Sequence, residues 1–133
     1  MRTYTLQLTI RSYECDSYGH VNNATYLNYL EYARMMALQE NNLTLDKMKK
    51  NGYLVVIRRI EIDYKRPLYM NEKVLIKTSL NHAGKTSGTF HQQILDEKKK
   101  QLSAEAWVTW VFTNLEGRPI PIPDEVRQVF NLK

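Results

Sequence analysis

An acid, an imidazole and two helix-capping amides lie close together near the start of the chain, in the segment Asp16-Ser17-Tyr18-Gly19-His20-Val21-Asn22-Asn23. Either asparagine can cap a helix, because residues 27–38 are almost entirely helix formers or aromatics. The first turn of a helix presents free amide hydrogens and a partial positive charge, which can hold a developing oxyanion. With Asp16 and His20 in the preceding loop, this arrangement suits hydrolysis of an activated acyl group.

The Asp16 carboxylate has two chemical roles open to it: it can deprotonate water, or it can attack a carbonyl carbon itself. A structural role, capping a turn or pairing with an arginine, is the alternative. His20 can bind the carbonyl, orient Asp16 or stabilise the loop. A mechanism with Cys15 as nucleophile is disfavoured, because neighbours on an extended segment point to opposite sides and Asp16 follows it directly. We therefore expect Asp16 and His20 to be catalytic.

The same residues resemble a known family. The pattern Asp-x-x-x-His-Val-Asn-Asn-x-x-Tyr over residues 16–26, then Tyr-x-Glu-x-Ala-Arg over residues 29–34, is similar to hotdog-fold acyl thioesterases of the 4-hydroxybenzoyl-CoA thioesterase-like group and their plant acyl-ACP relatives. The resemblance implies that a backbone amide near Asn23 polarises the thioester carbonyl, with Asn22 beside it. It also implies homodimers that share active sites across their interface and often pair into homotetramers.

Composition indicates one soluble domain over residues 1–133, with 43% hydrophobic residues and no long apolar run. The alternation over residues 1–10 predicts a strand rather than a targeting peptide, and one cysteine cannot form an internal disulfide. We expect a cytoplasmic protein without a membrane partner. The net charge of +5 attracts anions, but the scattered basic residues do not favour nucleic acid.

Coenzyme A enters this interpretation as part of the substrate, and no other cofactor is expected. Charge makes five basic residues candidates for its phosphates, and Lys85-Thr86-Ser87 is best placed, at a strand start; the candidates are Arg58, Arg59, Lys65, Arg66 and Lys85. Tyr26 is a candidate to line an acyl tunnel, although its helical spacing is also that of a core residue. Because His82 and His91 lack further ligands at metal spacing, no metal is predicted.

The hydrophobic pattern predicts an α+β fold: one strand, one long helix, then four strands. The helix is apolar nearly all round, so we expect it to be buried on most sides, and Glu31 and Arg34 can pair on one of its faces. Turn signals separate the expected strands and short helices, which are strands at 54–64, 74–80, 86–95 and 102–113, a helix within 41–52 and a helix from about 123. This order is that of a hotdog fold, a curved five-stranded antiparallel sheet around one long buried helix, whose open edges favour self-association.

The function that these features favour is hydrolysis of an acyl-CoA thioester to a free acid and CoA. Three alternatives remain. An acyl-ACP thioesterase would use the same chemistry with another carrier, and a hydratase or dehydratase of the same fold fits the spacing from Asp16 to His20 less well. A hotdog module that binds acyl-CoA without catalysis is the non-enzymatic alternative.

Overall fold

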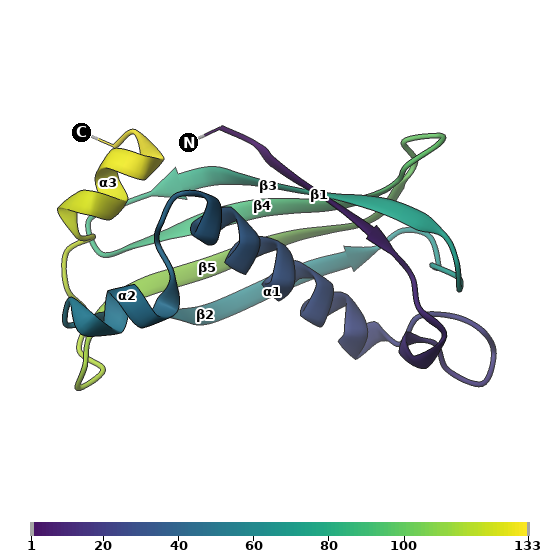
Figure 1. The fold of residues 1–133 in the computed structure, drawn as a ribbon, viewed down its shortest axis with the longest axis horizontal. Helices are drawn as coiled ribbons and strands as arrows, with labels where there is room; N and C mark the ends of the chain where they lie inside the picture. The colour runs from purple at the N-terminus through teal and green to yellow at the C-terminus, as the bar shows by residue number, and fades with distance from the viewer. Residues whose placement is uncertain (1, 133) are drawn as a thin grey trace.

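Five antiparallel strands and one long helix form two layers in the computed structural model, which describes residues 2–132 (Figure 1). The sheet order is β1-β3-β4-β5-β2, with strands β1 (Tyr4–Thr9), β2 (Tyr53–Tyr64), β3 (Lys73–Ala83), β4 (Ser87–Asp96) and β5 (Leu102–Asn114). Helix α1 (Asn23–Glu40) crosses one face of the sheet, and the short helices α2 (Leu45–Lys50) and α3 (Asp124–Phe130) lie at one end of it. The predicted fold class is confirmed.

The core lies between α1 and the sheet. One face of β5 is apolar because its residues alternate, and Ala106, Val108 and Trp110 are at most 1% exposed. On α1 the matching buried face includes Tyr29 and Leu30. The predicted strand over residues 1–10 spans Tyr4–Thr9, while Met1 lies outside the described residues. No helix within residues 2–132 is long and apolar enough to span a bilayer.

Three expectations from the sequence need correction. Helix α1 is not buried on most sides of this chain, because one sheet covers only one of its faces and leaves Leu27, Tyr32 and Met35 between 36% and 47% exposed. Arg34 makes no ion pair with Glu31 within the described residues and donates instead to Gln92 of β4. Strand β3 continues beyond position 80, because a register irregularity between residues 80 and 82 lets pairing with β4 resume through residue 83.

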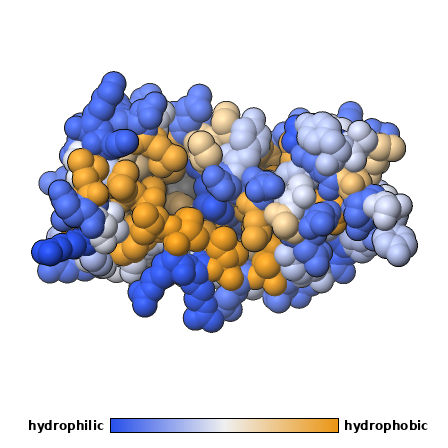
Figure 2. Space-filling view, turned by 90° about the horizontal axis from the view of Figure 1, so that it is seen from below, coloured by the Kyte–Doolittle hydropathy of each residue, from blue (hydrophilic) through white to orange (hydrophobic). Residues whose placement is uncertain are grey.

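Strand β2 is the edge of the sheet on which the apolar residues of α1 remain uncovered. It pairs with β5 on one side, and its other side has no strand partner within residues 2–132. Figure 2 views the molecule from the side where β2, α1 and α2 lie and shows apolar side chains gathered around a hollow there. Val56, Ile57 and Tyr64 of β2 are each more than 40% exposed. A twelve-residue open edge beside exposed apolar side chains favours pairing with another chain.

Gly88 is required where β4 passes beneath Trp110. A Cβ atom at position 88 would lie 2.5 Å from Cζ2 of Trp110 and 2.6 Å from the carbonyl oxygen of His82. Since that carbonyl belongs to the backbone of β3, the clash cannot be relieved by a side-chain rotation alone. We expect Gly88→Ala to lower the free energy of unfolding by about 2 kcal/mol, measured by urea denaturation. Gly84→Ala is the matched control, because its Cβ atom would meet nothing closer than 3.7 Å; equal stability of the two variants would contradict the prediction.

Candidate active site

The Asp16 loop is a closed turn that holds the carboxylate in place. Oδ1 of Asp16 accepts hydrogen bonds from the amides of Tyr18 at 2.9 Å and His20 at 3.2 Å, and the amide of Asp16 donates to the carbonyl of His20 at 2.7 Å. Gly19 has a φ of +83°, which a residue with a side chain rarely adopts. Oδ2 of Asp16 has no donor among the described residues. The turn therefore uses one carboxylate oxygen and leaves the other available to a substrate or a water molecule.

The N-terminus of α1 presents a free amide beside this loop. The side chain of Asn22 caps the helix by accepting from the amide of Ala24 at 2.8 Å, as one of the two capping assignments predicted. The amide of Asn23, the first of the helix, has no acceptor among residues 2–132. The hydroxyl of Tyr64, at the end of β2, donates to the carbonyl of Asn23 at 3.2 Å. An unpaired amide at a fixed helix start is a suitable donor to an oxyanion.

One open cavity of about 400 Å³ brings the loop and the helix start together. Five of the predicted site residues line it, namely Asp16, His20, Asn22, Asn23 and Tyr26. The rest of the wall consists of Val21 and of the last residue of β2 with the three residues that follow it, namely Tyr64, Lys65, Arg66 and Pro67. Lys65 and Arg66 were predicted only as phosphate ligands, from their charge. Their position beside the helix start depends on long-range strand pairing, which the sequence does not reveal.

His20 and Tyr26 both line this cavity, but His20 is half-buried and Tyr26 is fully buried. The imidazole of His20 packs edge-on against Tyr69, with ring centroids 4.9 Å apart. Tyr26 is 2% exposed and packs against Tyr64, so it belongs to the core as well as to the cavity wall. Burial raises the pKa of the Tyr26 hydroxyl. Cys15 directs its thiol toward the carbonyl of Arg11 and does not line the cavity.

Glu14 supports the loop from its other side. Its carboxylate pairs with the guanidinium of Arg11 at 2.7 Å and accepts from the Arg11 amide at 2.8 Å. Burial by itself would raise the pKa of Glu14, but these contacts with Arg11 outweigh it and lower that pKa. The carbonyl of Glu14 accepts from the amide of Asn22 at 3.3 Å, which ties the residue before the helix to the segment before the loop.

The remaining predicted phosphate ligands lie elsewhere on the chain. Arg58 and Arg59 are exposed in the middle of β2, where Arg58 occupies a bulge and Arg59 pairs with Glu61 at 2.9 Å. Lys85-Thr86-Ser87 leads into β4, and Ser87 is level with Val56 near the start of β2. The rise of a strand places that level roughly 25 Å from the end of β2 that lines the Asp16 cavity. Within one chain these residues do not meet the Asp16 loop.

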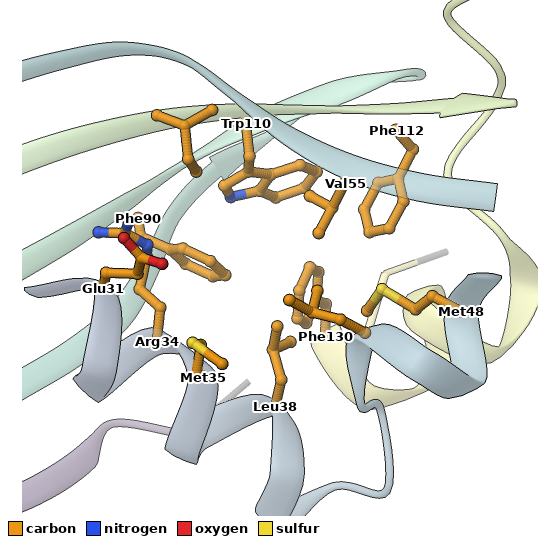
Figure 3. A pocket seen from close by; sticks show the side chains of 12 residues that line it. Glu31, Arg34, Met35, Leu38, Met48, Val55, Phe90, Trp110, Phe112 and Phe130 are labelled. Atoms are coloured by element: carbon orange, nitrogen blue, oxygen red, sulfur yellow. The ribbon is translucent and has the colours of Figure 1, made fainter. Parts of the chain in front are cut away.

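A second, mainly apolar cavity of about 210 Å³ lies beside the C-terminal half of α1, under α2 and α3 (Figure 3). Its walls come from six elements and include Met35, Leu38, Met48, Val55, Phe90, Trp110, Phe112 and Phe130. Two charged side chains also line it, Glu31 and Arg34 of α1. The shape and the lining suit a hydrocarbon chain with a polar contact in one wall.

The described residues contain no group of three or more His, Cys, Asp or Glu side chains that could hold a metal ion. The groups at the Asp16 cavity include a carboxylate, an imidazole and a backbone amide.

Comparison with known proteins identifies relatives over almost the whole chain. The model of the thioesterase-like superfamily matches residues 10–130. The long-chain acyl-CoA thioesterase FadM of Escherichia coli is 33% identical, with 92% of each chain covered. The chloroplastic acyl-acyl carrier protein thioesterase ATL3 of Arabidopsis thaliana is 26% identical, over 96% of this chain and 67% of that protein.

Among solved structures, a 1,4-dihydroxy-2-naphthoyl-CoA thioesterase from Synechocystis superposes with a TM-score of 0.91. It is 19% identical, over 98% of this chain and 96% of that one. At 19% identity, this structural similarity supports the fold alone.

Proposed function

Since the chain belongs to the thioesterase-like superfamily and is a hotdog hydrolase of acyl-CoA thioesters, we propose that Asp16 activates the attack on the thioester and that the amide of Asn23 holds its carbonyl oxygen. One observation carries the proposal: Asp16 and Asn23, whose amide has no acceptor among residues 2–132, line the same cavity. The two groups come from a loop and a helix start that hydrogen bonds fix in place.

Hydrolysis in this site begins with an attack on the thioester carbon. As general base, Asp16 takes a proton from water, and the hydroxide adds to the carbonyl; as nucleophile, Asp16 adds directly and forms a mixed anhydride that water later opens. In both routes the carbonyl oxygen becomes negative and accepts a hydrogen bond from the amide of Asn23. The carbon–sulfur bond then breaks, CoA leaves as a thiolate that is reprotonated, and the free acid remains. His20 lies at the same cavity and contributes to binding the carbonyl or to orienting Asp16.

The proposed active unit is a homodimer joined through β2. Two copies of an edge strand related by a two-fold axis pair antiparallel, so the start of the partner's β2 lies beside the end of this chain's β2. Pairing covers the open edge and the apolar side chains of α1 beside it, which are Leu27, Tyr32 and Met35. Further pairing of dimers into a tetramer remains an expectation from the family resemblance.

Two consequences for the substrate follow from this arrangement. The apolar cavity extends to Val55 at the start of β2, roughly 30 Å along that strand from the end that lines the Asp16 cavity. In the proposed dimer this start lies beside Asp16 of the partner subunit. We place the acyl chain of each substrate in the apolar cavity of the partner. Lys85 of the partner subunit then lies toward the same end, together with Lys65 and Arg66 of this chain, where the phosphates of CoA approach.

The nature of the substrate follows from the apolar cavity and the relatives together. FadM is named for long-chain acyl-CoA, and a cavity lined by Met, Leu and Phe side chains suits an aliphatic chain. We therefore propose a fatty acyl-CoA as substrate. An acyl carrier protein is the second candidate carrier, favoured by the Arabidopsis relative and by the positive charge of the chain.

A panel of thioesters tests this function. Thiol release is measured with aromatic, short-chain, medium-chain and long-chain acyl-CoAs, beside the matching acyl-ACPs and an enoyl-CoA hydration assay. We expect the highest kcat/KM for an aliphatic acyl-CoA of medium or long chain. Faster thiol release from acyl-ACP than from acyl-CoA of equal chain length would identify the acyl carrier protein as the preferred carrier. Tight binding of acyl-CoA without release of thiol would refute hydrolysis.

A further inference from the structure

Arg34 is a buried cation in the wall of a mainly apolar cavity. The residue is 7% exposed, and Nη1 donates to Oε1 of Gln92 at 3.0 Å. Among the described residues no carboxylate lies within ion-pairing distance of its guanidinium. A buried charge with a neutral partner is unfavourable unless further acceptors meet its remaining donors.

The guanidinium of Arg34 is held in place from the sheet. Gln92 is 0% exposed, and its Nε2 donates to Oγ1 of Thr78 at 2.9 Å and to the carbonyl of Leu30 at 3.0 Å. With its amide nitrogen anchored in this way, Gln92 has Oε1 turned toward Arg34. The arginine is therefore positioned by a network that spans β3, β4 and α1.

The free donors of Arg34 open onto the cavity. The enclosed side-chain nitrogens without a hydrogen-bond partner within residues 2–132 are Arg66 Nε and Trp110 Nε1. No nitrogen of Arg34 is among them, although within residues 2–132 its guanidinium donates only to Gln92. The nitrogens of Arg34 that lack an acceptor are therefore not fully enclosed, unlike the indole nitrogen of Trp110, and Arg34 is a residue of the cavity wall.

We propose that Arg34 donates a hydrogen bond to a neutral oxygen, a hydroxyl or oxo group, carried by the acyl chain in this cavity, so that the enzyme prefers oxygenated fatty acyl thioesters. This inference rests on the proposed hydrolysis. A hydrocarbon chain alone would leave the buried donors of Arg34 unmet, whereas an oxygen on the chain accepts from them.

The charge near Arg34 favours a neutral oxygen over a carboxylate. Burial lowers the pKa of Arg34, and the nearby Glu31 carboxylate opposes that effect. Figure 3 shows both charged side chains at the same side of the cavity. Because Glu31 already supplies a negative charge there, a second carboxylate would gain less from Arg34 than it would from an isolated cation. A hydroxyl or oxo oxygen brings no such charge.

The test compares acyl-CoAs of one chain length that carry no substituent, a hydroxyl or an oxo group at successive positions, or a terminal carboxylate. We expect kcat/KM to be about 10- to 100-fold higher for the best hydroxy or oxo substrate than for the unsubstituted one. Arg34→Met removes the donors at similar volume, and we expect the ratio of the two kcat/KM values to fall to about 1. Arg34→Lys keeps a donor and is expected to keep part of the preference.

The ratio within each variant separates specificity from stability, and melting temperatures show whether each variant is folded. Equal turnover of plain and oxygenated substrates by the wild type would overturn the inference while leaving hydrolysis intact. If folded Arg34→Met kept the preference for oxygenated substrates, Arg34 would not be the residue that recognises the oxygen. A preference for the terminal carboxylate would contradict recognition of a neutral oxygen. Absence of turnover with every thioester would instead refute the proposed function itself.

Discussion

The Asp16→Asn variant is expected to lose about 100- to 10,000-fold in kcat while keeping a melting temperature near that of the wild type. Asparagine cannot accept a proton from water or attack a carbonyl, so both routes open to Asp16 are closed. Its side-chain oxygen still accepts hydrogen bonds, so the amides of Tyr18 and His20 keep their partner and the turn stays closed. Initial rates of thiol release at saturating acyl-CoA measure the effect.

A matched control for this variant is available in the turn between β4 and β5. Asp96 also accepts a backbone hydrogen bond inside a turn, from the amide of Lys99 at 2.6 Å, but it does not line the Asp16 cavity. We expect Asp96→Asn to retain kcat within about twofold. If folded Asp16→Asn turned over at the rate of the control, the loop would be a structural turn and the catalytic assignment would fall.

Labelled water distinguishes the two roles of Asp16. When Asp16 is the nucleophile, water that opens the anhydride at the enzyme's own carbonyl leaves labelled oxygen in the Asp16 carboxylate. When Asp16 is a general base, the label enters the released acid and leaves the protein unlabelled. Mass spectrometry of the peptide that contains residue 16 after many turnovers reads out this difference.

The site residues that could be predicted from the sequence are those that local signals place together. The turn glycine at position 19, the cap at Asn22 and the acid at Asp16 are within a few residues of one another, so their geometry depends on one loop and one helix start. The order of elements was equally accessible, because alternating apolar residues mark each strand.

The features that escaped prediction depend on contacts between distant parts of the chain. Lys65 reaches the Asp16 cavity because β2 is the edge strand and its end meets α1, an arrangement that the order of elements does not reveal. The burial of Arg34 depends on Gln92, which is 58 residues away and appears in the sequence as an ordinary polar residue of a strand. Helical spacing suggested a pair with Glu31, but tertiary contacts with the sheet outweighed that local pairing.

A mixed dimer tests the proposal that each acyl chain occupies the partner's cavity. Leu38 is half-buried in the cavity wall, and Leu38→Trp adds an aromatic ring that fills it. In a dimer of one Asp16→Asn chain and one Leu38→Trp chain, a site shared between chains leaves one position with both defects and the other with neither. We expect the purified mixed dimer to recover about half of the wild-type activity, although each homodimer is nearly inactive.

Sites contained within one chain predict the opposite result for the mixed dimer. Each chain would then carry one defect that its partner cannot repair, and activity would stay near that of the homodimers. Co-expression with two different affinity tags and purification on both isolates the mixed dimer, and thiol release measures its activity. Leu38→Met preserves volume and serves as the control, since it should leave kcat/KM for acyl-CoA almost unchanged if filling of the cavity causes the loss. Recovery in the mixed dimer requires both dimerisation and a shared site. Only then can the intact Asp16 of the Leu38→Trp chain act on an acyl chain held in the open cavity of the Asp16→Asn chain.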